Sequence, residues 1–470
     1  MKVLLVNPPQ INLITNNIPS VVDEERGYNP PLGILYVAAY ARENTPHKIR
    51  VIDAVVEELD YPALKSRIAL EKPDVVGITA TTFTLVDACE TARIVKEIDR
   101  EIKVVMGGPH PYIYPQETIN LPGVDFLVLG EGEEVFSALV NNLHNPAALR
   151  KIQGIVFKHG GEIINTGNPP LIEELGSLPF PARDLTPYEK YYSLIAKTQP
   201  VTTMITSRGC PFKCLFCDRP HLGKRFRPRP AVNVVDEMES CVGLGIHEIL
   251  IYDDTFTVKK ERVFEICREI RERGLNVGWD VRARVDTITP EMLKAMKDAG
   301  CERIHYGVEA GSPEVIKTLR KGITVEQVRR TFRETKDAGI STLAYFMIGS
   351  PGETRAQMEE SLRLAAELAP DYLHLAITTP FPETDLYRMG FERGVLKDDY
   401  WREFARAPKP GFTPRVWDEY LTRDELVELL HKGYKDFYLR PGYIWKGIRG
   451  LKSLSELKSK ARAGLKLFRI

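Results

Sequence analysis

The chain contains 470 residues, with 43% hydrophobic and 27% charged side chains, a composition typical of a globular protein. Lysine plus arginine and aspartate plus glutamate are equal at 64 each, so no overall electrostatic field points to nucleic acid or to an acidic partner. The length exceeds one ordinary core, and seven cysteines are too few for a disulfide scaffold, so we expect a cytoplasmic protein of two or three domains.

From Met1 the chain runs directly into a strand pattern unlike a signal peptide, and no window approaches the ~18 apolar residues of a membrane span. The first 150 residues alternate helical patterns, at 32–42 and 85–98, with short apolar runs. These runs predict strands at 3–6, 50–53, 75–79, 104–106 and 126–129. The alternation predicts a doubly wound, Rossmann-like parallel sheet over residues 1–150 (an α/β fold).

Such sheets bind ligands at the carboxyl ends of their strands. Polar or glycine-rich segments stand at four of these ends, at 7–9, 79–82, 107–110 and 130–133. Each alone is typical of an ordinary turn, but four together indicate a ligand-binding edge.

Residues 151–195 are predicted to be a linker, because a small hairpin pattern (154–158 and 162–165) leads into proline-rich chain. A second βα series follows over 196–380. Its strands are expected at 202–207, 248–253, 277–282, 303–309, 343–348 and 372–378. Six such units predict a partial (β/α)6 barrel of the TIM type, with its chemistry at the carboxyl ends of the strands. Residues 381–470 are expected to form a helical C-terminal cap.

Three cysteines follow the first of these strands in the spacing Cys-x3-Cys-x2-Cys, at Cys210, Cys214 and Cys217. Three thiolates this close can bind three corners of a cubane iron–sulfur cluster and leave its fourth iron open. A zinc site is the alternative, but structural zinc normally has a fourth ligand nearby, and His221 is the one candidate. A chance trio of buried cysteines is the other alternative.

The cysteine spacing, with the aromatic Phe216 before the last cysteine, resembles the signature of the radical S-adenosylmethionine (SAM) superfamily. Further segments at strand ends are similar to its motifs: 252–257 (Tyr-Asp-Asp-Thr-Phe-Thr), 307–312 (Gly-Val-Glu-Ala-Gly-Ser) and 348–354 (Ile-Gly-Ser-Pro-Gly-Glu-Thr). Ala310 replaces the serine usual in the second segment. Each match is weak alone, and the ordered set is strong.

The resemblance implies a catalytic [4Fe–4S] cluster on Cys210, Cys214 and Cys217, where SAM is cleaved to a 5′-deoxyadenosyl radical. It implies an external electron donor of the flavodoxin or ferredoxin type. By position, Phe216, Asp253, Arg282 and Glu309 are expected to contact the cofactor. For Asp253 and Arg282 the alternative is an ordinary solvated charge at a strand end.

A doubly wound domain ahead of a radical SAM core resembles the cobalamin-binding class of the superfamily. Gly107 and Gly108 match the glycine pair that admits the nucleotide tail of cobalamin, and Thr79 or Thr81 stands where that fold supplies a hydroxyl group. The loop after the first strand, Pro8-Pro9-Gln10-Ile11-Asn12-Leu13, offers no axial histidine, unlike base-off cobalamin domains. A vestigial or purely structural sheet is the alternative.

The function that the resemblance implies is cobalamin-dependent methylation of an unactivated carbon in a small-molecule or lipid-like substrate. An oxidative cyclase similar to the anaerobic Mg-protoporphyrin monomethyl ester cyclase is the alternative. A methylthiotransferase would show a second N-terminal cysteine set. A non-enzymatic cobalamin carrier or sensor would have no need of the cysteine triplet.

The last residues, 440–470, combine nine lysines or arginines and one acidic residue with apolar residues at helical spacing. Basic amphipathic helices can lie on anionic membrane surfaces. We therefore expect either a peripheral membrane contact or a helix that packs on the barrel.

Overall fold

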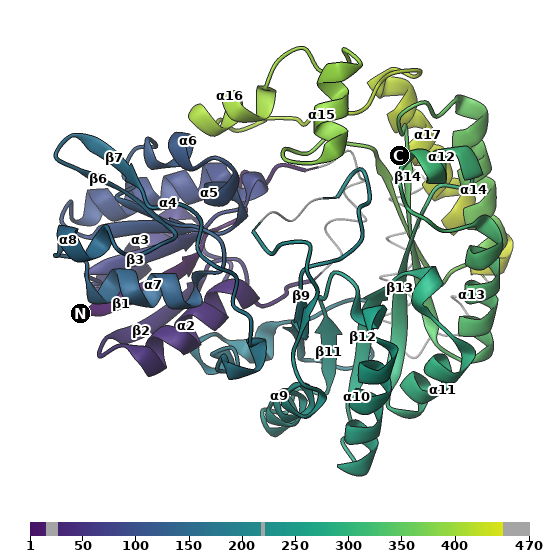
Figure 1. Cartoon of the computed structure of the whole chain (residues 1–470), viewed down its shortest axis with the longest axis horizontal. Coiled ribbons are helices and arrows are strands. Elements are labelled where there is room, and N and C mark those ends of the chain that lie inside the picture. Colours follow the sequence, from purple (N-terminus) through teal and green to yellow (C-terminus); the bar gives the residue numbers. More distant parts are fainter. Residues whose placement is uncertain (16–26, 218–220, 445–470) are drawn as a thin grey trace.

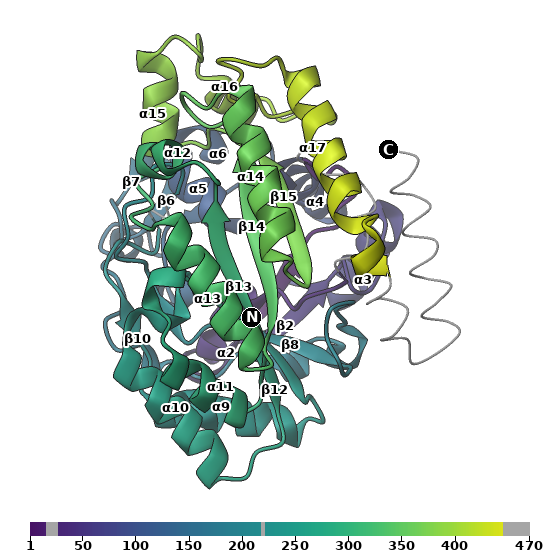
Figure 2. The same cartoon turned by 90° about the vertical axis from the view of Figure 1, so that its right-hand side faces the viewer.

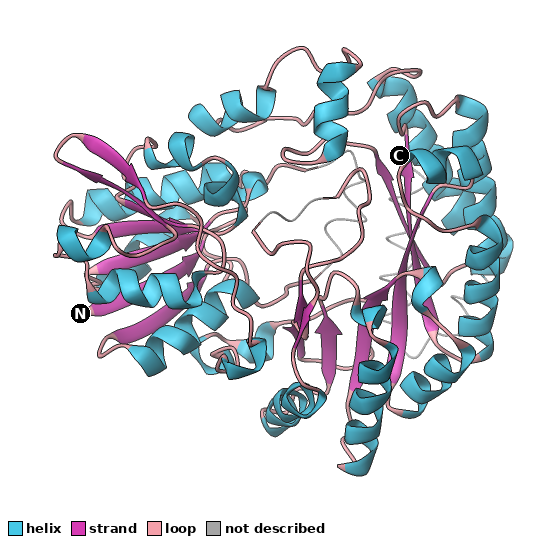
Figure 3. Ribbon diagram, in the orientation of Figure 1, coloured by secondary structure: helices cyan, strands magenta, loops and turns pink. Residues whose placement is uncertain are grey.

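The computed structural model describes residues 1–15, 27–217 and 221–444. It contains two large sheets that lie side by side, one from each half of the chain, and helices pack against both sheets (Figures 1 and 3). The predicted α/β fold, with a doubly wound front domain, a partial barrel and a helical C-terminal region, is confirmed. No helix in the described part of the chain is both long and apolar enough to cross a membrane.

The front sheet has the strand order β2-β1-β3-β4-β5-β6-β7. Its parallel strands are β1 (Lys2–Asn7), β2 (Lys48–Asp53), β3 (Val75–Thr79), β4 (Lys103–Gly107) and β5 (Phe126–Val128). Successive side chains of β1 enter opposite cores, with Val3 and Leu5 on one face and Leu4 and Val6 on the other. Because both faces are buried, the strands are almost continuously apolar.

Helices cover both faces of this sheet. One face packs against α2 (Leu32–Asn44) and α7 (Gly132–Asn141), and the other against α3 (Tyr61–Glu71) and α4 (Leu85–Ile98). The strand order reverses direction at β1, which has β2 on one side and β3 on the other. The carboxyl edge at this reversal is where doubly wound sheets bind ligands.

The hairpin that the sequence analysis assigned to the linker belongs to the front sheet. Its strands β6 (Ile155–His159) and β7 (Glu162–Asn165) continue the sheet, with Val128 opposite Ile155 in an antiparallel pair. The backbone groups on the outer side of β5 would otherwise be unpaired, which favours the addition of this hairpin. The sheet therefore continues past residue 150 to Asn165.

The second sheet is wholly parallel, in the order β15-β14-β13-β12-β11-β8. Its strands are β8 (Val201–Met204), β11 (Glu248–Ile251), β12 (Gly278–Ala283), β13 (Cys301–Glu309), β14 (Ser341–Ile348) and β15 (Tyr372–Ile377). Its outer helices include α9 (Ala231–Gly243), α10 (Lys260–Glu272), α11 (Pro290–Asp298), α13 (Val325–Asp337) and α14 (Arg355–Leu368).

The open edge of the barrel at β15 is covered by α17 (Arg423–Tyr438), which lies beside α14 on the outside of the sheet (Figure 2). The hydroxyl group of Tyr434 accepts a hydrogen bond from the Leu375 amide and donates one to the Leu375 carbonyl. Tyr438 does the same at Leu373. These side chains satisfy backbone groups of an edge strand that a neighbouring strand would otherwise pair with.

Part of the C-terminal region packs on the front domain instead of capping the barrel alone. Helices α15 (Asp385–Glu392) and α16 (Tyr400–Arg406) cross from the barrel toward the front sheet (Figure 1). Trp401 is fully buried there, beside Phe83 of the front domain and Phe381. The front domain and this part of the C-terminal region therefore share an apolar core. Residues 445–470, which include most of the basic tail, lie outside the described residues.

Candidate active site

The cysteine loop begins directly after β9 (Ser207–Arg208), at the carboxyl end of the first barrel strand. Cys210 and Cys214 are half-buried and Cys217 is exposed. Gly209 has φ +80°, and a Cβ atom there would stand 2.3 Å from the Arg225 carbonyl oxygen, so only glycine fits. The buried Leu215 between the cysteines donates a hydrogen bond of 2.9 Å to the Leu319 carbonyl and accepts one of 2.9 Å from Leu386. The loop is therefore fixed to the barrel between its second and third cysteines.

Two polar side chains lie close to the cysteine sulfurs. The hydroxyl oxygen of Thr255 is 3.7 Å from Cys210 Sγ, and Nη1 of Arg284 is 3.8 Å from Cys214 Sγ. Burial raises the pKa of the Cys214 thiol, although Lys321 and Arg284 oppose the rise. Metal binding deprotonates a thiol, and the nearby cations would stabilise the thiolate that results.

In the part of the chain that the structure describes, no three His, Cys, Asp or Glu side chains converge on a single metal ion. The thiolates of a [4Fe–4S] site bind three different irons, so a cluster does not require that convergence. His221, the possible fourth zinc ligand, packs its ring against Tyr112 of the front domain.

Asp253 holds the chain that leads into the cysteine loop. Its carboxylate accepts four hydrogen bonds, from the backbone amides and the hydroxyl groups of Thr206 and Ser207, at 2.6–3.0 Å. The side chain is 1% exposed. Sequence position predicted a direct contact with SAM, whereas the structure uses both carboxylate oxygens to position the backbone before Cys210.

Arg282 and Glu309 are placed by different contacts. Arg282 stacks 3.7 Å above the Tyr252 ring and donates to the Ile251 carbonyl, so it lines the carboxyl ends of β11 and β12. Glu309 accepts a hydrogen bond of 2.6 Å from Lys321 in a buried ion pair. Its φ of +71° is strained for a residue that is not glycine, and such strain gathers at functional sites. The same Lys321 lies 5.9 Å from the Phe216 ring.

Three neighbours of the cysteines were not predicted: Thr255, Arg284 and Lys321. Thr255 falls inside the segment 252–257, so its motif could have indicated it. Arg284 stands two residues after Arg282, which places it on the same side of the extended chain. Lys321 follows α12 (Pro313–Thr318), and no local pattern marks it.

The expected cobalamin edge has its glycine pair in a close backbone contact. Gly107 ends β4, and Gly108 has φ +106°, with its Cα facing Ala80 so closely that a Cβ would lie 2.7 Å from the Ala80 oxygen. Thr79 ends β3 half-buried, whereas the Thr81 hydroxyl is engaged in a capping box with Thr84. Thr79 is therefore the better placed of the two hydroxyl groups.

His110 adds a feature that the sequence analysis did not single out. It is fully buried, its Nδ1 lies 3.0 Å from the Thr82 hydroxyl oxygen, and its Nε2 has no hydrogen-bond partner among the described residues. Burial lowers its pKa to about 3, so the ring is neutral. A buried polar atom without a partner is uncommon in proteins, and a bound group is one explanation for it. A glycine pair two residues before such a side chain fits the tail of a large organic cofactor.

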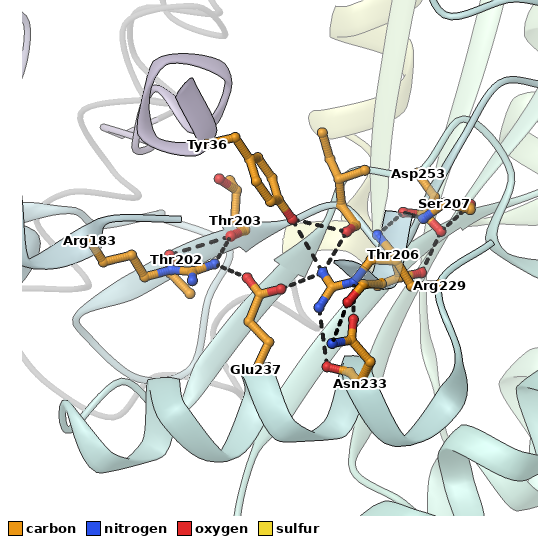
Figure 4. A network of polar contacts seen from close by, with 12 residues as sticks. Tyr36, Arg183, Thr202, Thr203, Thr206, Ser207, Arg229, Asn233, Glu237 and Asp253 are labelled. Atoms are coloured by element: carbon orange, nitrogen blue, oxygen red, sulfur yellow. Dashed lines mark hydrogen bonds and ion pairs between the residues drawn. The ribbon is translucent and has the colours of Figure 1, made fainter. Parts of the chain in front are cut away.

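The two domains meet in a buried polar network just before the cysteine loop (Figure 4). The hydroxyl group of Tyr36 in α2 donates to the Ile205 carbonyl and accepts from Arg229 at 3.2 Å. Arg229 and Arg183 both pair with Glu237 of α9, whose carboxylate is fully buried. Burial alone would raise the pKa of Glu237, but the two guanidinium groups hold it below its ordinary value. The Tyr36 hydroxyl group thus joins the front domain to the chain that follows the first barrel strand and to the buried ion pairs beside it.

Comparison with known proteins matches both halves of this arrangement. The B12 binding domain family matches residues 19–140, and the radical SAM superfamily matches residues 204–365. An uncharacterized methyltransferase of Pyrococcus horikoshii is 36% identical over 451 residues, which cover 95% of each chain. The chain belongs to the B12-binding radical SAM enzymes.

Other known proteins are also similar in sequence or in fold. An anaerobic magnesium-protoporphyrin IX monomethyl ester cyclase of Rubrivivax gelatinosus is 29% identical over 94% of this chain and 78% of its own. Among solved structures, the cobalamin-dependent SAM radical enzyme OxsB has a TM-score of 0.75 at 19% identity, over 99% of this chain and 72% of that one. The radical SAM methyltransferase TsrM of Kitasatospora setae has a TM-score of 0.68 at 22% identity, over 85% and 79%. At these identities the two structures show the fold.

As a B12-binding radical SAM enzyme, the chain uses a [4Fe–4S] cluster, SAM and cobalamin. Enzymes of this kind act on small-molecule substrates and need a reductant. The radical SAM match includes the cysteine loop, and the B12-binding match includes most of the front sheet.

Proposed function

We propose that this enzyme transfers a methyl group from SAM, by way of cobalamin, to an unactivated carbon of a small molecule. The observation that carries the proposal is the pairing of a cysteine loop and a glycine-lined front-sheet edge in one chain, which aligns along 95% of its length with a methyltransferase. When bound, the cluster and SAM supply a 5′-deoxyadenosyl radical, and cobalamin supplies a transferable methyl group.

The chain's own residues would hold these groups. Cys210, Cys214 and Cys217 would bind three irons, and the fourth would remain open to the amine and carboxylate of SAM. The Glu309–Lys321 pair and Arg284 are near enough to Cys214 to orient those two groups by charge. Arg282, on the neighbouring strand end, would contact the rest of SAM. Asp253 would act indirectly, by fixing the backbone before Cys210.

At the front sheet, Gly107 and Gly108 would admit the nucleotide tail of cobalamin, and Thr79 would donate a hydrogen bond to it. The loop after β1 contains no histidine between residues 8 and 15. Its Asn12 is tied to the buried Asp87 of α4 by backbone and side-chain hydrogen bonds. The cobalt would therefore have no histidine ligand from this loop.

The second candidate is an oxidative cyclase with the same cofactors. The 29% identity to the Rubrivivax gelatinosus cyclase over 94% of this chain supports it. An oxidative cyclase would give an oxidised product without a new methyl group. A methyltransferase would give a product in which a methyl group replaces one carbon-bound hydrogen, a net gain of CH2.

An anaerobic assay separates the two. The reconstituted enzyme receives SAM labelled in its methyl group, hydroxocobalamin, a reductant of the flavodoxin or ferredoxin type, and lipid, tetrapyrrole or peptide candidates. Label in a carbon-bound methyl of the product supports methyl transfer, and an unlabelled ring-closed product supports the cyclase. A variant with Cys210, Cys214 and Cys217 replaced by alanine should lose both iron and SAM cleavage. The matched control is Cys89→Ala, on α4 of the front domain. Full iron–sulfur absorbance in the triple variant would refute the assignment of the cluster.

A further inference from the structure

The segment after β5, Gly130-Glu131-Gly132-Glu133, looked in the sequence like one more ligand-binding strand end, but its carboxylates face the barrel domain. Glu131 accepts hydrogen bonds from Arg208 at 2.8 Å and from two nitrogens of Arg227 at 2.8 and 3.0 Å. Glu133 accepts another from Arg208. All four side chains are at most 8% exposed. Two front-domain carboxylates thus share two barrel-domain guanidinium groups in a buried cluster.

The charges in this cluster are matched. Burial alone would raise the pKa of Glu131, but Arg227 and Arg208 hold it below its ordinary value, so the carboxylate is ionised. A third donor, the Ile172 amide at 2.7 Å, fills its remaining capacity. Desolvation makes a buried ion pair a poor source of stability, although losing one partner is costly. These four charged side chains are therefore better explained by the position that they specify for the chain than by the stability that they add.

That position is the start of the cysteine loop. Arg208 and Arg227 face each other across the antiparallel ribbon of β9 and β10 (Arg227–Pro228). Only Gly209 separates Arg208 from Cys210, so the two Cα atoms are at most ~7 Å apart along the chain. Gly209 cannot open into a wider turn to absorb a shift of Arg208, because backbone oxygens lie close to it. Movement of Arg208 must pass to Cys210.

The residues that precede Cys210, 205–208, are held one after another; we name them the lead-in segment. Tyr36 of the front domain binds Ile205, Asp253 binds Thr206 and Ser207, and the glutamates bind Arg208. The Arg208 guanidinium also lies 5.3 Å above the Tyr36 ring. The front domain therefore holds both ends of the lead-in segment, and the barrel holds its middle. Figure 4 shows the contacts of Tyr36 and of Asp253.

We propose that Glu131 and Glu133 are positioning residues for the iron–sulfur cluster: through Arg208 they fix Cys210 relative to the edge of the front sheet. The proposal rests on the proposed function only in assigning the cluster to the cysteine loop. It gives the front domain a second task beside cobalamin binding, which is to set the geometry of the site where SAM is cleaved.

The test uses the full-length, cobalamin-free protein with a reconstituted cluster. The variants are Glu131→Gln and Glu133→Gln, which keep the shape of the side chain and remove its charge, and Arg208→Lys, which keeps the charge but cannot span both carboxylates. The measurements are iron per chain, the EPR spectrum of the reduced cluster with and without SAM, and the rate of SAM cleavage. The control is Asp125→Asn, which breaks a half-buried pair with Lys96 in the same domain.

We expect the two glutamine variants to bind iron but to show an altered cluster spectrum and SAM cleavage about tenfold slower. Arg208→Lys should be intermediate, and Asp125→Asn should match wild type in both. If Glu131→Gln fails to fold, the other two variants still test the proposal. Glu133→Gln weakens only one hydrogen bond, and Arg208→Lys keeps the positive charge. Wild-type spectra and cleavage rates in these variants, with only a lower unfolding temperature, would overturn the proposal. If instead the proposed methyl transfer is wrong, the wild-type enzyme should cleave SAM but transfer no methyl group from it.

Discussion

Nη1 of Arg284 lies 3.8 Å from Cys214 Sγ, although 70 residues separate them in sequence. The guanidinium is held on all sides, by Asp286 at 2.9 Å, by the Lys321 carbonyl at 2.5 Å and by the Phe212 ring 3.9 Å away. A fixed positive charge beside a cysteine sulfur stabilises the thiolate that binds iron.

Arg284→Met should therefore weaken the site by removing this charge while keeping much of the side-chain volume. We expect the rate of SAM cleavage to fall roughly tenfold, which corresponds to a loss of about 1.4 kcal/mol of charge stabilisation. Arg284→Lys, which keeps the charge but loses the two-pronged bond to Asp286, should fall less. Cleavage of SAM per bound iron measures both, and equal rates in the Met variant and wild type would show that the charge has no part in the chemistry.

Gly108→Val should weaken cobalamin binding. A Cβ at this position would meet the Ala80 backbone at 2.7 Å, and the φ of +106° disfavours any side chain, so the strand ends must separate. Retention of hydroxocobalamin through gel filtration measures binding, with unfolding temperature measured alongside. Gly33→Ala on α2, where a Cβ would meet nothing within 4 Å, is the control. Undiminished cobalamin retention by the valine variant would exclude the glycine pair from the binding site.

Glu353, in the turn after β14, should make stability depend on pH. It is fully buried, its Oε2 accepts from the Ser350 amide at 2.8 Å, and burial raises its pKa from 4.5 to about 7. A raised carboxyl pKa in the folded state stabilises the protein below pH 4.5, and this contribution is lost as pH rises through about 7. The loss is on the order of 3 kcal/mol.

Glu353→Gln remains neutral at every pH and should lack this loss. In denaturant unfolding of the cluster-free protein at pH 5 and pH 8, the free energy of unfolding of the variant should rise relative to that of wild type as pH rises. The control is Glu359→Gln, at a half-buried carboxylate on α14 that pairs with Arg355, and it should follow wild type at both pH values. A constant difference between Glu353→Gln and wild type across this range would contradict a titration of Glu353.

The basic tail remains a prediction, since residues 445–470 lie outside the described part of the chain. If the tail binds an anionic membrane, each basic residue near the surface contributes about 1 kcal/mol, and salt should weaken the binding. Sedimentation with anionic vesicles should then pellet the full chain at low salt more than at high salt, and more than a chain ending at residue 444. Loss of solubility on truncation, with no pelleting of either form, would indicate packing on the barrel.

Features that depend on neighbouring residues in the chain could be predicted from the sequence. The alternating strands and helices, the cysteine spacing and the glycine turns are local patterns, because backbone geometry and side-chain periodicity operate over a few residues. They were enough to predict both α/β domains, and the resemblance of their motifs to known families implied the three cofactors. The strand ends that carry Gly108, Cys210 and Glu309 follow directly from that alternation.

The tertiary structure decided which side chains reach the cysteines and which do not. Asp253 stands at the predicted strand end, but its carboxylate turns to Thr206 and Ser207 because four nearby donors satisfy it. Lys321, Arg284 and the Glu131–Arg208 pair come together from elements that are distant in sequence. Such contacts depend on how sheets twist and domains dock, and a buried charge finds its partner only when both are removed from water together.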